Sequence, residues 1–179
     1  MVNVSKLKLT WLQTQILRKL FIKTGSSINQ RQLAIELNVS QPAIKKALPY
    51  LEQVNFIKVE KDQRLSIKLN TENNKITQLK RVDNLKHLYE SNLADYLEKE
   101  FAGATIIVFG SFSRGEDTIN SDIDIAVIGR KEKQLKLENY KKLFEREINI
   151  QYYESFQKIN KHLKENLANG IILFGGFEL

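Results

Sequence analysis

Two short motifs carry the residues of this chain that are best suited to chemistry. Gly110-Ser111 follows an apolar run at residues 105–109, and Asp122-Ile-Asp124 comes ten residues further on, before a second apolar run. The first run is typical of a buried strand that ends in a tight turn. Because side chains alternate along a strand, Asp122 and Asp124 share one face. Carboxylate oxygens and phosphates are the ligands that Mg²⁺ prefers, so the pattern predicts a site for a divalent metal and a phosphate group.

The spacing of these motifs resembles a known signature. Gly110-Ser111, ten intervening residues and then Asp122-x-Asp124 is similar to the signature of the DNA polymerase β-type nucleotidyltransferase superfamily, and in particular to its minimal nucleotidyltransferase group. The Arg-Gly-Glu segment at residues 114–116, together with Ser121, also resembles that group. The resemblance covers roughly residues 101–151. The alternative interpretation is a glycine turn joined to a solvated acidic strand.

The resemblance implies a reaction and a role for each motif residue. It implies magnesium-dependent transfer of an NMP from an NTP, with ATP as the expected donor, to a hydroxyl acceptor. Gly110 would let the backbone approach the triphosphate, and Ser111 would add its hydroxyl and N–H to an anion-binding turn. Arg114 would pair with outer phosphate oxygens. Asp122 and Asp124 would be the catalytic ligands of the magnesium ions.

The third carboxylate of the resembled superfamily has no direct counterpart here. Its usual place, an apolar-Asp-apolar setting on a later strand, is occupied by Ile148-Asn149-Ile150. Glu147 lies two residues before Asn149 and therefore shares its strand face. Either Glu147 substitutes as a catalytic metal ligand beside Asn149, or the metal is held weakly and the chain binds NTP with little catalysis. The longer side chain of Glu147 favours compensation.

Residues 9–70 resemble a winged helix-turn-helix domain. Apolar helical stripes are expected from Thr10, over residues 30–37 and from Ser40, followed by a hairpin of strands at residues 56–60 and 65–69. The run from Leu33 to Ile44 is similar to the helix-turn-helix core of that family. Pro49 predicts a kink or an early end of the third helix near Leu48, because proline costs about 3 kcal/mol in a helix interior.

The charge distribution suggests an anionic partner for this first domain. Residues 1–80 carry a net charge of +9 and residues 81–179 carry −2, which together give the +7 of the whole chain. By the resemblance, the third helix would enter the major groove of duplex DNA. The DNA-binding residues would then be Gln41, Lys45 and Lys46 on that helix, with Lys61 and Arg64 on the wing. Protein docking is the alternative for this domain.

The predicted fold class is therefore α+β: an N-terminal winged helix-turn-helix domain at residues 1–70, followed by a small mixed-sheet nucleotidyltransferase domain at residues 71–179. A linking helix is expected at about residues 76–100, where apolar residues repeat at helical spacing. Helices are expected over residues 135–144 and 155–167, and a half-buried strand over residues 147–152. The terminal run at residues 171–174 predicts a buried or edge strand without an assigned function.

The amino-acid composition of the chain excludes several classes of protein. No run of the sequence reaches the eighteen or so apolar residues that a membrane span needs, and the first residues lack the apolar core of a secretory signal, so we expect a cytoplasmic protein. The absence of cysteine excludes disulfides and thiolate metal sites, and two histidines do not suffice for a histidine-rich zinc site.

Three functions remain open from the sequence. The first is a nucleotidyltransferase with a DNA-binding or docking head; minimal nucleotidyltransferases often act as antitoxins, which makes a hydroxyl of a partner toxin protein a candidate acceptor. The second is a DNA-binding transcription regulator whose degenerate transferase domain only binds nucleotide. The third is a nucleotidyltransferase that acts on a small molecule or an RNA end. A homodimer is compatible with each of them.

Overall fold

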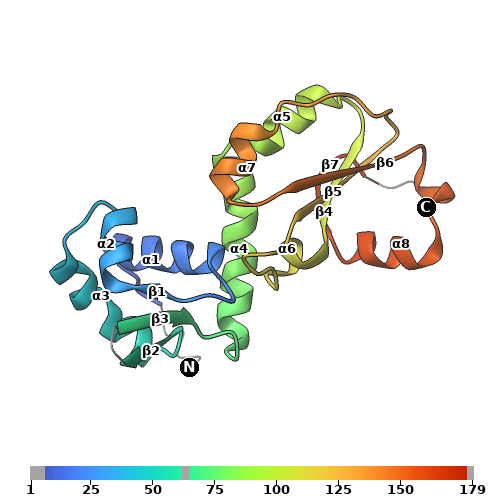
Figure 1. Ribbon diagram of the computed structural model, residues 1–179. Helices are drawn as coiled ribbons and strands as arrows, with labels where there is room; N and C mark the ends of the chain where they lie inside the picture. Colours follow the sequence, from blue (N-terminus) through green and yellow to red (C-terminus); the bar gives the residue numbers. More distant parts are fainter. Residues whose placement is uncertain (1–6, 62–64, 177–179) are drawn as a thin grey trace. The chain divides into compact units, whose positions relative to one another are not determined.

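The chain divides into two compact units, residues 1–76 and 77–179. Figure 1 shows the computed structural model, which describes residues 7–61 and 65–176. The division falls slightly after the expected boundary at residue 70, within a helix, α4, that covers Asn74–Glu90. Each unit is described by itself below.

The first unit has the element order of a winged helix-turn-helix domain, which confirms the expected fold of the head. A three-stranded antiparallel sheet, ordered β1-β3-β2, lies with three helices (Figure 1). Its elements are α1 (Trp11–Ile22), β1 (Ile28–Asn29), α2 (Gln30–Glu36), α3 (Gln41–Gln53), β2 (Ile57–Lys61) and β3 (Leu65–Leu69).

The ends of these helices follow from local hydrogen bonds. The Thr10 hydroxyl accepts from the Gln13 N–H at 3.3 Å and the Gln13 side chain accepts from the Thr10 N–H at 2.9 Å, which is the expected capping box. Ser40 caps α3 by accepting from the Ala43 N–H. Trp11, the first residue of α1, is 69% exposed, whereas the apolar side chains further along α1 are buried in the core.

Pro49 does not end α3, so the early end predicted near Leu48 is wrong. The helix continues through Pro49 to Gln53. Leu48 and Leu51, on either side of the proline, are both buried in the core, and their burial holds the second half of the helix in place. Pro49 and Lys45 are exposed, so water can solvate the Lys45 carbonyl that the missing N–H leaves without its helical donor.

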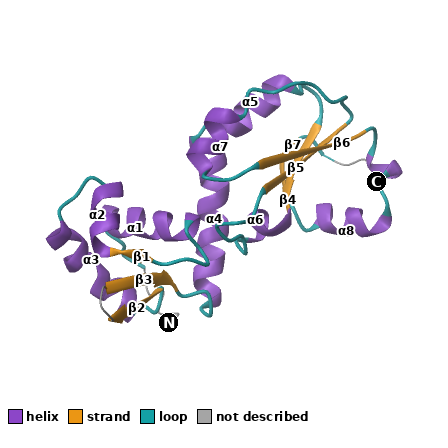
Figure 2. Ribbon diagram, in the orientation of Figure 1, coloured by secondary structure: helices purple, strands orange, loops and turns teal. Residues whose placement is uncertain are grey.

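The second unit is built on a mixed four-stranded sheet ordered β6-β5-β4-β7 (Figure 2). Strand β4 pairs antiparallel with β5 and β7, and β5 pairs parallel with β6. The strands are β4 (Thr105–Phe109), β5 (Ile123–Ile128), β6 (Ile148–Tyr153) and β7 (Ile171–Phe174). The helices are α4, α5 (Leu93–Glu100), α6 (Gly110–Arg114), α7 (Glu138–Phe144), the 3₁₀ turn η1 (Phe156–Lys158) and α8 (Lys161–Ala168).

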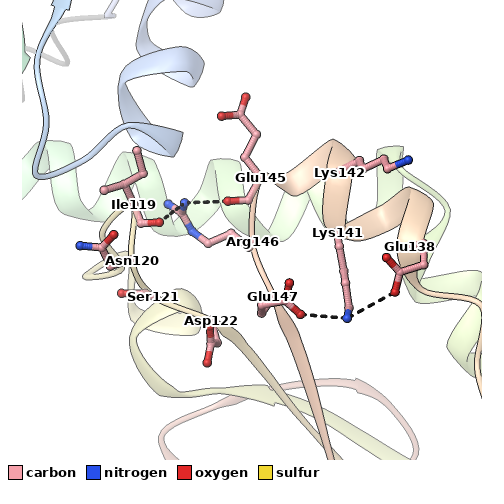
Figure 3. Close-up of a pocket in the computed structure, with 10 residues that line it drawn as sticks. All are labelled: Ile119, Asn120, Ser121, Asp122, Glu138, Lys141, Lys142, Glu145, Arg146 and Glu147. Atoms are coloured by element: carbon pink, nitrogen blue, oxygen red, sulfur yellow. Dashed lines mark hydrogen bonds and ion pairs between the residues drawn. The ribbon is translucent and has the colours of Figure 1, made fainter.

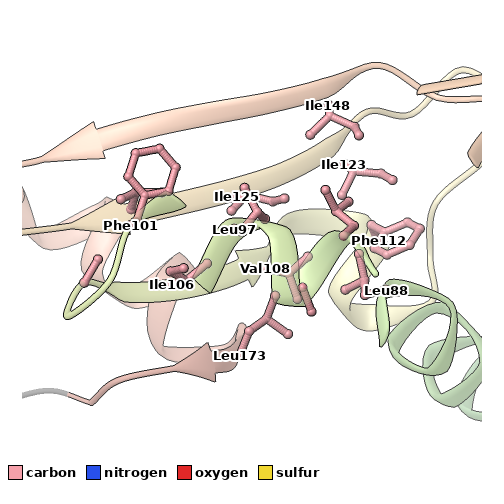
Figure 4. Close-up of a cluster of buried hydrophobic side chains, with 14 of the residues drawn as sticks. Leu88, Leu97, Phe101, Ile106, Val108, Phe112, Ile123, Ile125, Ile148 and Leu173 are labelled. Atoms are coloured by element: carbon pink, nitrogen blue, oxygen red, sulfur yellow. The ribbon is translucent and has the colours of Figure 1, made fainter. Parts of the chain in front are cut away.

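Most apolar side chains of this sheet are buried, and they lie on both of its faces. One face packs on residues from α4 and α5, and Figure 4 shows the cluster around Leu97, Val108 and Ile125. The other face, with Ile107 and Ala126, packs on residues from η1 to α8. Alternation along β5 places Asp124 on this second face, together with Ala126. Most of both faces is therefore covered, whereas Ile172 on β7 is 42% exposed.

Two expected helices are each divided in the structure. The helix expected over residues 76–100 is interrupted at Asn92, whose φ is 60°, a left-handed conformation that asparagine tolerates better than most residues. The helix expected over residues 155–167 is divided into η1 and α8, because Asn160 caps α8 by accepting from the Leu163 N–H at 2.9 Å. Within the part of the chain that the structure describes, no helix is both long and apolar enough to span a membrane.

Candidate active site

The Gly-Ser turn and the Asp-x-Asp strand meet at one point of the sheet. Phe109, the last residue of β4, is the register partner of Asp124 on β5. Gly110 follows with a φ of 73°, which disfavours any side chain. A Cβ atom added to Gly110 would lie 2.7 Å from Asp124 Oδ2, so the carboxylate occupies the space that a side chain would need. The glycine thus joins the two motifs into one site.

Asp122, Asp124 and Asn149 gather on neighbouring parallel strands. Asp124 is the register partner of Asn149, and the Asn149 side-chain amide donates to Asp122 Oδ2 at 2.9 Å. Burial raises the pKa of Asp124, and the negative charge of Asp122 raises it further, while a hydrogen bond from Asn149 acts in the opposite direction. A carboxylate whose charge is disfavoured by burial and by a neighbouring carboxylate is a suitable place for a divalent cation.

Glu147, the residue expected to compensate for the missing third carboxylate, is paired with a lysine on α7. Its carboxylate forms an ion pair with Lys141 Nζ at 2.8 Å, and Lys141 also lies 3.5 Å from Glu138 (Figure 3). The hydrogen bond to Glu147 raises the pKa of Lys141. Among residues 7–61 and 65–176, no three His, Cys, Asp or Glu side chains are placed to hold a metal. The ion pair with Lys141 therefore accounts for the position of the Glu147 carboxylate.

A buried ion network, which the sequence analysis missed, supports the loop between the two motifs. Asp117 is 1% exposed; its Oδ1 accepts from Asn84 at 2.8 Å and lies 3.1 Å from Lys80 Nζ. Its Oδ2 lies 3.1 Å from the guanidinium of Arg146, which also donates to the Ile119 carbonyl at 3.3 Å. Burial lowers the pKa of Lys80, and Asp117 opposes this shift.

This network fixes the chain on both sides of the aspartates. Asn84 also donates to the Phe112 carbonyl at 2.9 Å, so α4 is tied to α6 as well as to the loop. Arg146 directly precedes Glu147 and the strand that carries Asn149. The sequence contains one signal for this network. Lys80 and Asn84 are polar residues that lie four apart among apolar positions of the helix, so their side chains share one helix face.

The remaining predicted nucleotide-binding residues lie along α6. Ser111 is half-buried, and its carbonyl accepts from the Glu116 N–H at 3.0 Å. The guanidinium of Arg114 is bound through Nε to Glu116 at 2.7 Å. This ion pair links the Arg114 side chain to Glu116, just after the end of the helix.

The predicted DNA-binding residues lie in the first unit. Gln41, Lys45 and Lys46 are all exposed on α3, which leaves their side chains accessible to a partner. Arg64 and the side chain of Lys61 lie outside the described residues, so the prediction for the wing has no structural outcome.

Comparison with known proteins assigns a class to the second unit. Residues 90–174 match the family model of the nucleotidyltransferase domain, and this range contains both motifs and Asn149. Together with the mixed sheet, this match confirms the α+β fold class with a nucleotidyltransferase domain after the head. No curated protein matches the chain.

Two solved structures resemble part of the chain at low similarity. The S. aureus MepR–DNA complex is 22% identical, covers 51% of this chain and 81% of its own, and gives a TM-score of 0.36. The transcriptional regulator BldR from Sulfolobus solfataricus is 19% identical, covers 55% of this chain and 65% of its own, and gives a TM-score of 0.35. Both TM-scores are too low to support an argument about the fold. The winged helix-turn-helix fold of the first unit is therefore assigned from the order of its own helices and strands.

Proposed function

We propose that the second unit is a magnesium-dependent nucleotidyltransferase that moves an NMP from an NTP, with ATP as the expected donor, to a hydroxyl acceptor. The observation that carries the proposal is the position of the Asp124 carboxylate, whose Oδ2 lies 2.7 Å from where a Cβ atom of residue 110 would stand, so that the two motifs form one site. The match of residues 90–174 to the nucleotidyltransferase domain supports the reaction class.

The residues present fit a magnesium ion beside the start of β5. Asp122 and Asp124 offer hard oxygen donors on one side of β5, and Asn149 can add an amide oxygen if its side chain turns over. A magnesium ion there would neutralise phosphate charge and lower the pKa of the acceptor hydroxyl. Ser111 and Arg114 would hold the phosphates.

The transfer itself exchanges one phosphorus–oxygen bond for another. The acceptor oxygen bonds to the α-phosphorus, the bond from that phosphorus to the bridging oxygen breaks, and pyrophosphate leaves. The hydroxyl proton is released to solvent. The resemblance to minimal nucleotidyltransferases suggests a hydroxyl on a partner protein such as a toxin as the acceptor. A small molecule or an RNA end remains the alternative.

Calorimetry and radiolabel transfer test this function. The wild-type chain should bind ATP only with magnesium, and Asp122→Ala or Asp124→Ala should weaken binding at least tenfold, whereas Glu98→Ala, an exposed acid on α5, should have no effect. ATP binding that ignores magnesium and both aspartate variants would remove the metal site from the proposal. A pull-down from the native host, labelled with each NTP in turn, would identify the acceptor.

A nucleotide-binding regulator without transfer is the second candidate, because Asn149 is neutral and the Glu147 carboxylate is paired with Lys141. Transfer rates of the wild type, Glu147→Gln and Asn149→Asp separate the two candidates. If Glu147 leaves Lys141 to complete the metal site, Glu147→Gln abolishes transfer and preserves NTP binding. If it does not, wild-type transfer is slow, Glu147→Gln changes little and Asn149→Asp raises the rate.

For the head we propose binding to duplex DNA through α3. The support is the exposure of Lys45 and Lys46 and the net charge of +9 over residues 1–80. Affinity of the full chain should fall steeply with salt, and replacing both lysines with alanine should reduce the slope of log K against log salt by about two. Lys19→Ala is the control, since Glu36 lies 3.5 Å from that lysine. Absence of salt-sensitive binding to any duplex would favour protein docking.

A further inference from the structure

Strand β6 forms an open edge of the four-stranded sheet. The order β6-β5-β4-β7 gives β6 a partner strand on one side only (Figure 2). At the two ends of β6, the Ile123 N–H donates to the Glu147 carbonyl at 2.9 Å and the Gly129 N–H donates to the Tyr153 carbonyl at 2.8 Å. The register between β5 and β6 is continuous, so the odd-numbered residues of β6 are the ones that bond to β5.

The even-numbered residues of β6 therefore direct their backbone groups away from the sheet. These residues are Ile148, Ile150 and Tyr152. Within residues 7–61 and 65–176, their N–H and C=O groups make no hydrogen bond to another residue. Free peptide groups in such a row form a template on which another strand can pair. The six residues of β6 also contain no charged residue and no proline, so nothing in the strand itself opposes pairing.

The opposite edge of the sheet is better protected. Strand β7 has only four residues, and its register with β4 shifts between Ile106 and Ile107. Short strands and irregular registers are two features by which proteins prevent pairing at the edge of a sheet. The unprotected edge is therefore the one that carries Asn149, beside the aspartates.

The register of the sheet aligns this edge with the candidate metal site. Asp124 on β5 and Asn149 on β6 are register partners, and the side chains of register partners share one face of a sheet. A residue opposite Asn149 on an added strand would continue the same row, with its Cβ about 5 Å from that of Asn149. A Ser, Thr or Tyr hydroxyl at this position would lie on the face that carries Asp124.

A cavity lies at each end of β6. The cavity at the start of the strand has a volume of about 450 Å³, and Asp122, Lys142 and Glu147 are among its lining residues (Figure 3). The cavity at the end of the strand has a volume of about 550 Å³ and includes Tyr153 and Lys131. An extended segment paired with β6 would reach both cavities, which gives its flanking side chains places to bind.

The cavity at the end of β6 carries an excess of positive charge. The Arg130 guanidinium donates to two backbone carbonyls, so no acid neutralises it there. Lys131 is exposed and forms no ion pair in the described part of the chain. Of the two acids that line the cavity, Glu154 is paired with Lys158 at 2.6 Å, which leaves Glu132 to offset one of the two cations. An acidic side chain would therefore complement this cavity.

We propose that the acceptor is an extended protein segment that adds to the open edge of β6 as a further strand, with its hydroxyl beside Asn149 and an acidic residue in the cavity at Lys131. The inference rests on the proposed function, in which the acceptor oxygen bonds to the α-phosphorus and pyrophosphate leaves. A row of free N–H and C=O groups selects a peptide over a small molecule or an RNA end, because a peptide backbone supplies matching groups at strand spacing. Since Asn149 and Tyr153 lie at opposite ends of the strand, the acid should stand about four residues from the hydroxyl.

A pool of synthetic peptides tests the inference on the full chain. Each peptide has a single central Tyr, Ser or Thr, and its four neighbours on each side are drawn from residues without a hydroxyl group. With ATP and magnesium, the wild type should bind this pool and label it with AMP. The labelled peptides should be enriched in Asp or Glu about four positions from the hydroxyl. A pool with a central Phe is the control for labelling.

A proline at the centre of β6 tests whether the edge is the binding site. Ile150→Pro removes the outward N–H but no hydrogen bond to β5, and proline is tolerated at such positions of an edge strand. Ile150→Ala is the matched control, because it shortens the same side chain and keeps the N–H. Peptide binding and labelling should be about tenfold weaker in Ile150→Pro than in Ile150→Ala, with equal ATP affinities in the two variants.

Peptides that are N-methylated at alternate residues provide the test if Ile150→Pro does not fold. Only every second amide of an added strand faces β6. Methylation of one alternating set should therefore abolish binding, whereas methylation of the other set should leave it unchanged. Equal effects of the two sets would overturn the addition of a strand.

The outcomes separate this inference from the proposed function. A wild type that neither binds nor labels the pool overturns the edge as the acceptor site, and so does equal peptide binding by Ile150→Pro and Ile150→Ala. ATP binding and the labelling of another acceptor would survive either result. Peptide binding that depends on the Ile150 N–H, in a chain that transfers no AMP, keeps the strand-addition site and removes the enzyme.

Discussion

Asp117 and Asp124 lie close together in the sequence, yet their carboxylates have opposite electrostatic environments in the second unit. Asp117 is buried and both of its oxygens have partners, from Lys80, Asn84 and Arg146. Asp124 is half-buried beside Asp122, and its pKa is raised. A carboxylate surrounded by cations is a structural anchor, whereas one beside a second carboxylate is held ready for a ligand. Substitutions of the two should therefore change stability in opposite directions.

The largest expected effect is at the buried anchor. Asp117→Asn leaves Lys80 and Arg146 without their counter-charge in the interior, and breaking such a network by one partner costs about 3–5 kcal/mol. Hydrogen exchange of β4 and β5 peptides measures this loss in the second unit alone. Glu116→Gln changes an exposed neighbour and should shift stability by under about 0.5 kcal/mol. Equal protection in the two variants would contradict the anchoring role.

A smaller loss is expected where Asp124 touches the glycine turn. Gly110→Ala combines a left-handed backbone with a clash against the Asp124 carboxylate, and should cost about 1–3 kcal/mol and weaken magnesium-dependent ATP binding. Gly129→Ala is a matched control, because its φ of 88° is also left-handed but nothing lies within 4 Å of the added carbon. The difference between the two variants isolates the contact with Asp124. If the two variants lose the same stability and Gly110→Ala binds ATP as tightly as the wild type, the contact with Asp124 does not contribute to stability or to ATP binding.

Adding a third carboxylate beside Asp122 and Asp124 should make this site less stable without metal and more dependent on magnesium. Asn149→Asp replaces the amide donor to Asp122 with a negative charge, which should lower stability by about 1 kcal/mol without metal. The same change should raise magnesium affinity about tenfold, so that added magnesium reverses the loss. Asn149→Ala removes the donor and adds no charge, and should show no gain in magnesium affinity. Thermal melts at a series of magnesium concentrations measure both quantities, and a gain equal in the two variants would refute the explanation.

The smallest expected effect is a gain in stability on replacing Asp124, opposite in sign to the loss expected on replacing Asp117. Because the pKa of Asp124 is raised in the folded chain, the folded state binds the proton more tightly than the unfolded state. Ionised Asp124 therefore lowers stability above its folded pKa, and this cost disappears as the pH falls towards the ordinary value of 3.8. In chelator at neutral pH, Asp124→Asn should raise Tm by about 1–2 °C, and the gain should shrink on acidification. A lower Tm at neutral pH would contradict this.

The sequence was informative where one segment suffices to specify a feature. The apolar runs, the caps at Thr10 and Ser40 and the spacing of Gly110 and Asp124 predicted the elements and the junction between the two motifs. Features that depend on distant partners were missed or mispredicted. The Lys80–Asp117 pair joins residues 37 positions apart, and the side chain of Glu147 is directed by Lys141 on another element. Helix continuity at Pro49 likewise depended on tertiary burial of Leu51.

The exposure of Trp11 has a practical consequence for spectroscopy. It is the only tryptophan of the chain and belongs to the first unit, so tryptophan emission reports on the head without background from the second unit. Its 69% exposure makes that emission sensitive to quenchers added to the buffer and to a partner that covers α1. The same sample can therefore report duplex binding through fluorescence while nucleotide binding is followed by heat. A change in Trp11 emission on addition of magnesium and ATP would be a direct optical signal that the two units communicate.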